Sequence, residues 1–237
     1  MNGRAVIDCL DYTLLDHEAS EDELAGFVTR ANVARVGAVC IFAEYIEQVK
    51  PLLDAGIKLA VVAGGFPVGS HNLDEISKDI RAAADSGADE IDVVLEPRDA
   101  EDFPNEIELA KLTAMRDAAG KAMLKVILET PLLNERNMRA VARMALAAGA
   151  DFIKTCTGKR GPCSDEAAEI FAYEIMRHEL TFKEKRGMKL SGGIKTSDDI
   201  DRLTNLVNAQ DPSLISAGNS RFRVGASSVL DNLLNPN

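Results

Sequence analysis

The feature that most constrains the fold is a regular alternation of short β-branched segments with longer amphipathic ones along the whole chain. The stretches between the short segments place apolar residues at helical spacing, as in residues 72–87. Eight segments have the length and composition of β-strands. They are Ala5–Asp11, Ala38–Phe42, Lys58–Ala63, Glu90–Leu95, Ala122–Glu129, Phe152–Cys156, Met188–Ser191 and Arg221–Ala226. Strict β-α alternation predicts a parallel sheet covered by helices.

Helix-boundary residues support this order of elements. Helix N-caps are expected at Ser20, Asn134, Ser164 and Ser197, and left-handed C′ glycines at Gly37, Gly56, Gly87 and Gly149. Eight strands in 237 residues fit a closed barrel better than an open doubly wound sheet. The first β-α turn also lacks the G-x-G-x-x-G pattern of dinucleotide binding. We therefore predict an α/β protein with a single (β/α)8 TIM-barrel domain over residues 1–237.

Charge and composition exclude several classes of partner. A net charge of −11 argues against nucleic acid or an anionic membrane surface, because both favour basic patches. No apolar run approaches the ~20 residues of a membrane helix, and Asp8 precedes any signal-peptide core. Four cysteines without an export signal indicate reduced thiols, and the histidines (His17, His71 and His178) are too dispersed for a metal site. We expect a cytoplasmic protein that binds neither membranes nor metal.

Lys154 stands in an apolar, strand-like segment, F-I-K-T-C, followed by T-G-K-R-G. Lysine is almost never fully buried without a partner, so this position needs a chemical reason. Burial and a nearby positive charge both lower the pKa of an ammonium group, and the resulting amine can attack a carbonyl. Lys189, in G-M-K-L-S-G-G, can supply that charge. The two lysines together indicate Schiff-base chemistry.

An internal similarity brings acidic residues to the same region. Residues 86–94 and 148–156 both pass through Gly-Ala-Asp into a strand, which places Asp92 and Lys154 at equivalent positions. Alternation along L-K-V-I-L-E puts Lys125 and Glu129 on one face. If that face points inward, both residues lie close to Lys189 and to Asp11 of the first strand. All of them are then near the carboxyl ends of the strands, where barrel enzymes place their catalytic groups. The simpler alternative is a set of ion pairs that fills the barrel mouth.

Three turns on consecutive strands suggest a phosphate site. They are T-G-K at 157–159, S-G-G-I at 191–194 and G-A-S-S at 225–228. Turns of glycine and small hydroxyl residues expose backbone N–H groups to an anion, and the last of the three leads into a helix N-terminus. The loops after strands seven and eight commonly bind phosphate in barrels.

Taken together, these motifs resemble the deoxyribose-phosphate aldolase family over nearly the whole chain. The matching segments include L-D-Y-T-L-L, A-V-C-I-F, G-A-D-E-I-D-V-V, L-K-V-I-L-E-T, D-F-I-K-T-C-T-G-K, K-L-S-G-G-I-K-T and R-F-R-V-G-A-S-S. The resemblance implies a class I aldolase that reversibly cleaves 2-deoxy-D-ribose 5-phosphate to D-glyceraldehyde 3-phosphate and acetaldehyde without any cofactor. The substrate partner would be a small phosphorylated sugar.

The resemblance also implies roles for individual residues. Lys154 would form the Schiff base, Lys189 would keep it deprotonated, and Asp92 would take part in proton transfer. Asp11, Thr13, Cys40 and Lys125 would line the substrate pocket. The residues expected around the phosphate are Gly158, Lys159, Gly192, Gly193, Gly225, Ser227 and Ser228.

The chain departs from the family pattern at several positions. Tyr12 replaces a common histidine, Cys156 a serine and Lys195 an arginine, and the sequence ends in N-P-N where some members carry a tyrosine. Two alternatives stay open: a Schiff-base barrel lyase with a larger donor such as a ketose phosphate, and a non-catalytic sugar-phosphate-binding barrel. The oligomeric state is also open, and a homodimer is compatible with the sequence.

Overall fold

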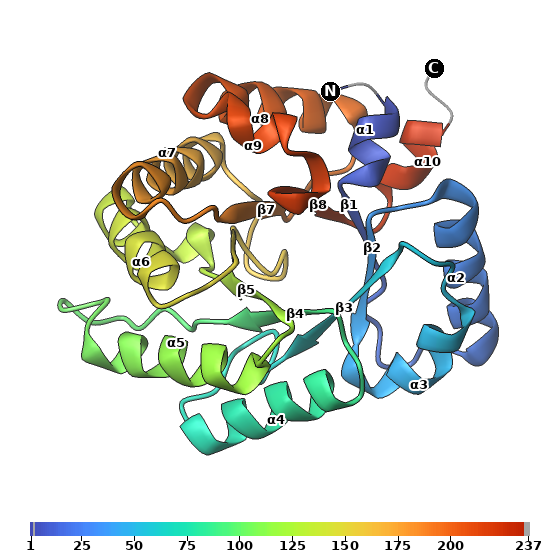
Figure 1. Cartoon of the computed structure of the whole chain (residues 1–237), viewed down its shortest axis with the longest axis horizontal. Helices are drawn as coiled ribbons and strands as arrows, with labels where there is room; N and C mark the ends of the chain where they lie inside the picture. The colour runs from blue at the N-terminus through green and yellow to red at the C-terminus, as the bar shows by residue number, and fades with distance from the viewer. Residues whose placement is uncertain (2, 235–237) are drawn as a thin grey trace.

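Eight parallel strands close into a barrel in which each strand pairs with its neighbours in the chain and β8 pairs with β1 (Figure 1). This fold is that of a computed structural model, which describes residues 1 and 3–234. The N-P-N ending lies outside the described residues. The strands are β1 (Leu10–Thr13), β2 (Ala38–Phe42), β3 (Lys58–Ala63), β4 (Glu90–Val94), β5 (Met123–Ile127), β6 (Phe152–Lys154), β7 (Gly187–Ser191) and β8 (Phe222–Ala226). The predicted (β/α)8 barrel is confirmed.

Helices surround the barrel and cover the outer face of its strands (Figure 1). The longer ones are α2 (Glu21–Ala34), α4 (Leu73–Asp85), α5 (Glu106–Ala119), α6 (Glu135–Ala147), α7 (Asp165–Phe182) and α8 (Ser197–Gln210). The shorter ones are α1 (Gly3–Asp8), α3 (Ile46–Val49), α9 (Pro212–Ser216) and α10 (Val229–Leu234). Alternate strand residues such as Ile91, Val93, Leu124 and Val126 are fully buried, as expected for the face that packs under the helices.

The first predicted strand, Ala5–Asp11, is wrong over most of its length. Residues 3–8 form α1, and β1 begins only at Leu10. Contacts distant in sequence hold this helix: Arg4 Nη1 donates to the Ala34 carbonyl at 2.7 Å, and the Gly37 N–H donates to the Ile7 carbonyl at 3.2 Å. A short apolar segment is compatible with either structure, and these tertiary contacts select the helix.

The predicted helix boundaries are largely confirmed. Ser20, Asn134 and Ser164 cap α2, α6 and α7, and Gly56, Gly87 and Gly149 have positive φ angles. The N-cap of α8, however, is Thr196 rather than Ser197, because Thr196 forms a capping box with Asp199.

Gly37 does not adopt the predicted left-handed conformation, which Arg35 adopts instead. Glycine is required at position 37 for a different reason: a Cβ there would lie 2.2 Å from the Asp8 carbonyl oxygen. Gly37 therefore marks a close approach between two backbone segments.

Strand register determines which side chains meet inside the barrel. Asp92 pairs with Lys125 across β4 and β5, Lys154 with Lys189 across β6 and β7, and Lys189 with Arg223 across β7 and β8. Side chains at matched positions of parallel strands point the same way, so these residues all face the barrel interior.

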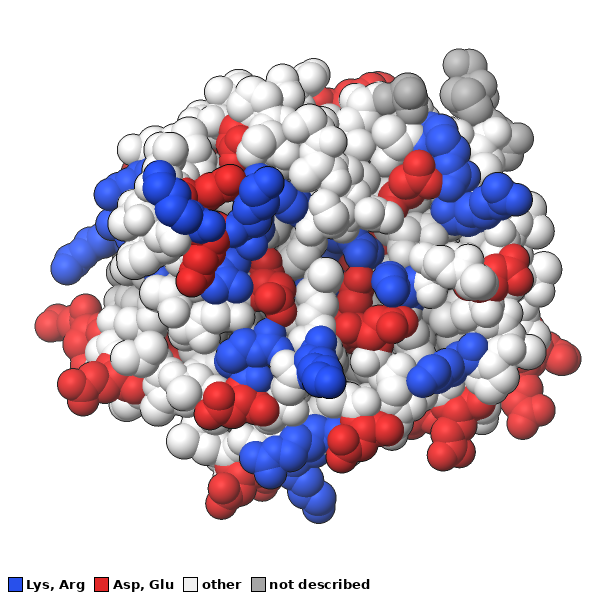
Figure 2. Space-filling view, viewed as in Figure 1, with Lys and Arg blue, Asp and Glu red and all other residues white. Residues whose placement is uncertain are grey.

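The outer surface carries both signs of charge. On the face in Figure 2, Lys and Arg side chains are interspersed with Asp and Glu, and the described residues form no broad basic area there. No helix within residues 1 and 3–234 has the length and apolar character to span a bilayer. The same residues contain no group of three or more His, Cys, Asp or Glu placed to bind a metal ion.

Candidate active site

Seven buried charged side chains meet in the barrel interior and form what we call the interior cluster. Its members come from six strands: Asp11 (β1), Glu90 and Asp92 (β4), Lys125 (β5), Lys154 (β6), Lys189 (β7) and Arg223 (β8). Each is at most 4% exposed. Buried charges persist only when they are paired and hydrogen-bonded, so the contacts within the cluster determine what it can do.

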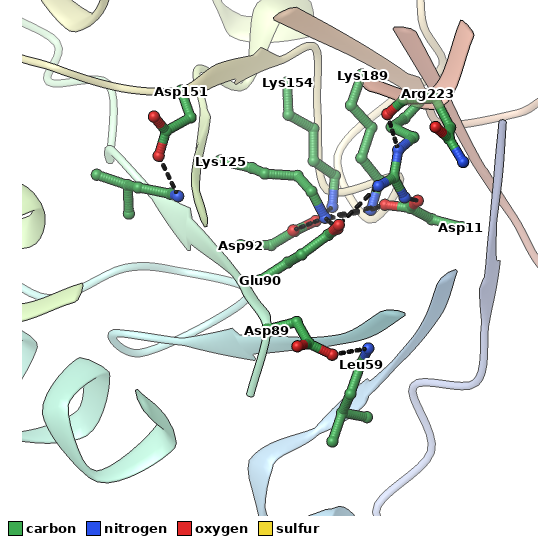
Figure 3. A network of polar contacts seen from close by, with 12 residues as sticks. Asp11, Leu59, Asp89, Glu90, Asp92, Lys125, Asp151, Lys154, Lys189 and Arg223 are labelled. Carbon is green, nitrogen blue, oxygen red and sulfur yellow. Dashed lines mark hydrogen bonds and ion pairs between the residues drawn. The ribbon is translucent and has the colours of Figure 1, made fainter. Parts of the chain in front are cut away.

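Asp92 is the acceptor shared by the two lysines predicted to carry the chemistry. Lys154 Nζ and Lys189 Nζ each donate to Asp92 Oδ2 at 2.8 Å. Lys189 Nζ also lies 2.6 Å from Asp11 Oδ2. Figure 3 shows the lysines reaching from neighbouring strands toward these two aspartates. The expected convergence of Asp92, Lys154, Lys189 and Asp11 is present.

Lys125 and Arg223 complete the cluster. Lys125 Nζ lies 3.0 Å from Asp92 Oδ1, 3.1 Å from Asp11 Oδ2 and 2.5 Å from Glu90 Oε2. Arg223 donates through Nη1 to Asp11 Oδ1 and through Nη2 to Glu90 Oε1, both at 2.6 Å. The planar guanidinium thus bridges two carboxylates.

The environment keeps these groups charged. Burial by itself would raise the pKa of Asp11 and of Asp92, but the positive charges around them outweigh it and hold both pKa values well below the usual range. For Lys125 and Lys189, burial would lower the pKa, but the neighbouring carboxylates outweigh it and raise it. Asp11 and Asp92 are therefore carboxylates, and Lys125 and Lys189 ammonium ions, near neutral pH.

A cavity of about 400 Å³ opens above the cluster, and Lys154 and Lys189 form part of its floor. Many predicted substrate-binding residues line it: Thr13, Gly158, Lys159, Gly192, Gly193, Gly225, Ser227 and Ser228. Asp16 and Lys195 line it as well. The cavity is built from the carboxyl ends of β1, β6, β7 and β8, which is the catalytic end of such barrels.

The three glycine-containing turns meet at this cavity. Gly158, Gly192 and Gly193 all have positive φ angles, a conformation that side-chain-bearing residues rarely adopt. The loop after β6 is tied to the turn after β7, because the Cys163 N–H donates to the Gly192 carbonyl at 3.0 Å. Helix α10 begins at Val229, directly after the third turn. Backbone N–H groups and the side chains of Lys159 and Lys195 are thus available to an anion.

Other predicted residues lie beneath the cavity. Asp11, Cys40, Asp92 and Lys125 are fully buried. Burial raises the pKa of the Cys40 thiol, despite the nearby lysines. Glu129 was expected beside the lysines. Instead it adopts a left-handed φ of 47° after the end of β5, and its Oε1 accepts the Thr157 N–H at 3.2 Å.

Sequence reasoning missed Glu90 and Arg223. The signal was present, because Glu90 lies two residues before Asp92 and Arg223 two residues before Gly225, on the same strand faces. Charged residues at strand starts are usually exposed, which hides such positions in a single sequence.

A larger cavity of about 620 Å³ lies outside the barrel on α6 and α7. Its residues include Arg139, Arg143 and Tyr173. Both arginines bind the buried carboxylate of Glu174, with Arg143 Nε at 2.7 Å from Glu174 Oε2. Since those arginines already serve to anchor α7 and no amine nucleophile is present among its lining residues, we place the active site at the barrel mouth.

The protein is a closed (β/α)8 barrel, and buried lysine side chains face a polar cavity at its catalytic end. These features define the class of barrel enzymes that use a lysine side chain in the active site. The sequence matches the family model described as DeoC/LacD family aldolase over residues 9–228. The chain belongs to the DeoC/LacD family of aldolases.

Curated relatives extend this result. A deoxyribose-phosphate aldolase from Corynebacterium jeikeium is 37% identical over 214 residues, which cover 82% of this chain and 86% of the relative. One from Nocardia farcinica is 34% identical over 224 residues, with 94% and 91% covered. Among solved structures, a putative deoxyribose-phosphate aldolase from Toxoplasma gondii superimposes with a TM-score of 0.84 at 21% identity, covering 98% of this chain and 93% of that one. The two curated relatives confirm the family resemblance seen in the sequence, and the solved structure confirms the fold.

Proposed function

We propose that this protein is a class I aldolase that reversibly cleaves 2-deoxy-D-ribose 5-phosphate to D-glyceraldehyde 3-phosphate and acetaldehyde. The observation that carries the proposal is the position of Lys154. Its ammonium nitrogen lies 2.8 Å from Asp92 Oδ2 within the buried cluster, while its side chain also lines the cavity. The relatives named above carry the same activity in their names.

In the synthetic direction, the neutral Lys154 amine attacks the acetaldehyde carbonyl, and the carbinolamine loses water to give an iminium ion. Loss of a proton from the methyl carbon gives an enamine. The enamine carbon then forms a bond to the aldehyde carbon of glyceraldehyde 3-phosphate, and that aldehyde oxygen takes up a proton. Hydrolysis of the new iminium ion releases the sugar phosphate and regenerates the amine, and cleavage is the reverse sequence.

Asp92 and Lys189 support these steps. The Asp92 carboxylate is the counter-ion of the Lys154 ammonium, and at 2.8 Å it stabilises the iminium cation that replaces it. Because its pKa is held low, Asp92 accepts a proton only transiently, and we propose that it exchanges that proton through a water molecule. Asp11 and Asp92 outweigh the effect of burial and raise the pKa of Lys189, so Lys189 adds a fixed positive charge beside Lys154. That charge is the basis of its proposed role in keeping the nucleophile deprotonated.

The remaining residues bind the substrate in this proposal. Thr13 lines the cavity beside Lys154, while Asp11, Cys40 and Lys125 support its floor from below. The three turns that contain Gly158, Lys159, Gly192, Gly193, Gly225, Ser227 and Ser228 hold the phosphate. Lys195 stands where an arginine is common, and it offers the phosphate a point charge instead of a bidentate fork.

We further propose that the enzyme acts in the cytoplasm, in keeping with the four free, buried cysteines within the described residues. For assembly we propose a homodimer. Light scattering of the purified protein tests this, with twice the 25.5 kDa chain mass expected. A tetramer is described for a deoxyribose phosphate aldolase from Aeropyrum pernix, so a tetrameric mass is the main competing result.

A cleavage assay tests the activity. The protein is incubated with deoxyribose 5-phosphate, with unphosphorylated deoxyribose or with a ketose phosphate. Acetaldehyde released from the two deoxyribose substrates is measured with an alcohol dehydrogenase, and glyceraldehyde 3-phosphate released from the two sugar phosphates is measured with a second coupled dehydrogenase. We expect the first substrate to be cleaved far better than the others. Cleavage of the ketose phosphate alone would assign a different donor, and binding of deoxyribose 5-phosphate without cleavage would indicate a non-catalytic barrel.

A further inference from the structure

The interior cluster contains more basic groups than carboxylates. Its basic members are Lys125, Lys154, Lys189 and Arg223, and its carboxylates are Asp11, Glu90 and Asp92. Four basic groups against three carboxylates leave one positive charge in excess when every member is ionised. An unbalanced charge in a buried site is unfavourable, so one basic group is expected to release its proton most easily.

The contacts identify Lys154 as that group. Arg223 bridges Asp11 and Glu90 with two bonds of 2.6 Å, and Lys125 touches all three carboxylates. Lys189 touches Asp11 and Asp92. Within the described residues, Lys154 has one carboxylate partner, and it shares that Asp92 oxygen with Lys189.

Arg223 is the member of the cluster whose positive charge does not change with pH. A guanidinium stays protonated at any working pH, unlike an ammonium group in a buried site. Its side chain is 4% exposed, and Nε is held by the Asn219 carbonyl at 2.6 Å. Arg223 therefore keeps one full positive charge against Asp11 and Glu90 at every working pH.

We propose that Arg223 is a positioning residue of the proposed Schiff-base reaction: by occupying Asp11 and Glu90, it leaves Lys154 as the basic group in excess and sets the pH at which the amine becomes nucleophilic. Arg223 is not among the described residues that line the cavity. It acts through the carboxylates and does not touch the substrate.

The other titratable groups near Lys154 form no ion pair with its ammonium group within the described residues. Glu129, after the end of β5, is buried and accepts the Thr157 N–H, and Asp16 lines the cavity above. Cys40 approaches from β2 and Cys156 follows Lys154 on its own segment. Burial raises the pKa of both thiols, that of Cys156 to about 11, so both are neutral at working pH. Lys159 and Lys195 line the cavity above, and their charges are exposed to solvent there.

Opposite charge changes test the proposal. The readout is the pH midpoint of Schiff-base formation, measured as the rate of borohydride trapping with acetaldehyde across a pH series. Arg223→Met leaves three basic groups for three carboxylates, so the midpoint should rise by about one pH unit or more. Glu90→Gln leaves four basic groups for two carboxylates, so the midpoint should fall by a similar amount.

Two further variants separate charge from structure. The double variant Arg223→Met/Glu90→Gln restores an excess of one and should return the midpoint to within about half a pH unit of wild type. Arg223→Lys places an ammonium group between Asp11 and Glu90, which should keep it protonated and so leave the midpoint near wild type, although it cannot reproduce the bidentate bridge. If Arg223→Met does not fold, Arg223→Lys and Glu90→Gln still decide the question.

Arg221→Met is the matched control. Arg221 is a buried arginine just before the same strand, but it pairs with Glu179 at 2.6 Å outside the cluster. Its loss should lower stability without moving the midpoint. Folded Arg223 and Glu90 variants that shift in the same direction, or not at all, would overturn the inference while leaving Schiff-base formation intact. Failure of the wild-type protein to form any Schiff base at Lys154 would instead reject the proposed function.

Discussion

The side chain of Lys154 combines two properties that seldom occur together, because it is 4% exposed and yet lines a cavity. Its position at the end of β6 brings it to the catalytic end of the barrel, and Asp92 holds its ammonium nitrogen in place. Lys154 is therefore placed where its amine can reach a carbonyl group bound in the cavity.

Replacing Lys154 by arginine tests this role at the residue scale. Lys154→Arg keeps the positive charge but removes the nucleophile, because a guanidinium stays protonated. We expect kcat for deoxyribose 5-phosphate cleavage to fall at least about 1,000-fold. Lys58→Arg, at an exposed lysine that begins β3, is the control and should leave kcat unchanged. A Lys154→Arg variant with substantial turnover would show that the charge alone matters.

Single residues were predictable where an unusual residue type or a repeated sequence pattern marked them. Lys154 was found because a lysine is unusual in an apolar strand, and Asp92 because the same Gly-Ala-Asp sequence precedes both strands. The structure places Lys154 Nζ 2.8 Å from Asp92 Oδ2. Arg223 was missed because it lies outside that repeat, and Glu90 because its counterpart in the repeat is the apolar Phe152. The partners of both residues also lie far away in the chain. A salt bridge across 133 residues depends on barrel closure, which local patterns do not encode.

At the scale of elements, the turns at the barrel mouth depend on backbone conformations that glycine allows. Gly192 has a φ of 100°, and a Cβ there would lie 2.4 Å from Cys156 Sγ and 3.1 Å from the Gly161 carbonyl oxygen. A side chain at this position would therefore displace the loop after β6 from the turn after β7. The proposed phosphate site is built from these two segments.

Gly192→Ala should raise KM for deoxyribose 5-phosphate by about tenfold or more, with a smaller effect on kcat, because the turn can no longer present its N–H groups. Gly56→Ala is the matched control, since Gly56 has the same φ of 100° but no atom within 4 Å of the added Cβ. Both variants should lose about 1 kcal/mol of stability from the left-handed conformation, and steady-state kinetics separates them. Equal KM values for the two variants would contradict a phosphate site at Gly192.

Elements were predicted well where periodicity and capping agreed. β2 and β3 have the predicted bounds, and Ser20, Asn134 and Ser164 cap helices as expected. The prediction of the first strand was wrong over residues 5–8, because their backbone groups form the hydrogen bonds of α1. Contacts with residues 34–37 hold this helix in place. The predicted end of the fifth strand at Glu129 was wrong, because Glu129 leaves the extended conformation and its side chain accepts a hydrogen bond from the neighbouring loop.

At the scale of the whole molecule, barrel closure gathers charges from six strands into one buried cluster, and this links folding stability to pH. The pKa values of Asp11 and Asp92 are lowered in the folded protein, so their contribution is present above the unfolded value of about 3.9 and is lost as pH falls below it. The pKa values of Lys125 and Lys189 are raised. Their contribution is present below about 10.4 and is lost as pH rises through the folded values.

Asp92→Asn should reveal this linkage. At pH 7 the variant should lose roughly 3 kcal/mol of unfolding free energy, because three lysines lose a charged partner. The difference from wild type should shrink at about pH 3, where unfolding of the wild-type protein is favoured by proton uptake at Asp92. Urea unfolding at both pH values measures it, with the exposed Asp117→Asn as control. An unchanged difference at the two pH values would mean that Asp92 is not ionised in the fold.

The barrel itself was predictable from the count and spacing of its strands, because eight β-α units in 237 residues leave few other arrangements. The oligomeric state could not be predicted from the sequence, because it depends on surface residues that follow no periodic sequence pattern.

Covalent trapping tests the central claim most directly. The protein is incubated with acetaldehyde and reduced with borohydride, and its peptides are mapped by mass spectrometry. We predict one ethylated residue, Lys154, with the same modification obtained when deoxyribose 5-phosphate replaces acetaldehyde, and with no modification in Lys154→Arg. Labelling of Lys189 or Lys125 instead, or labelling of Lys154 by a ketone donor alone, would contradict the proposed Schiff-base role of Lys154 with acetaldehyde.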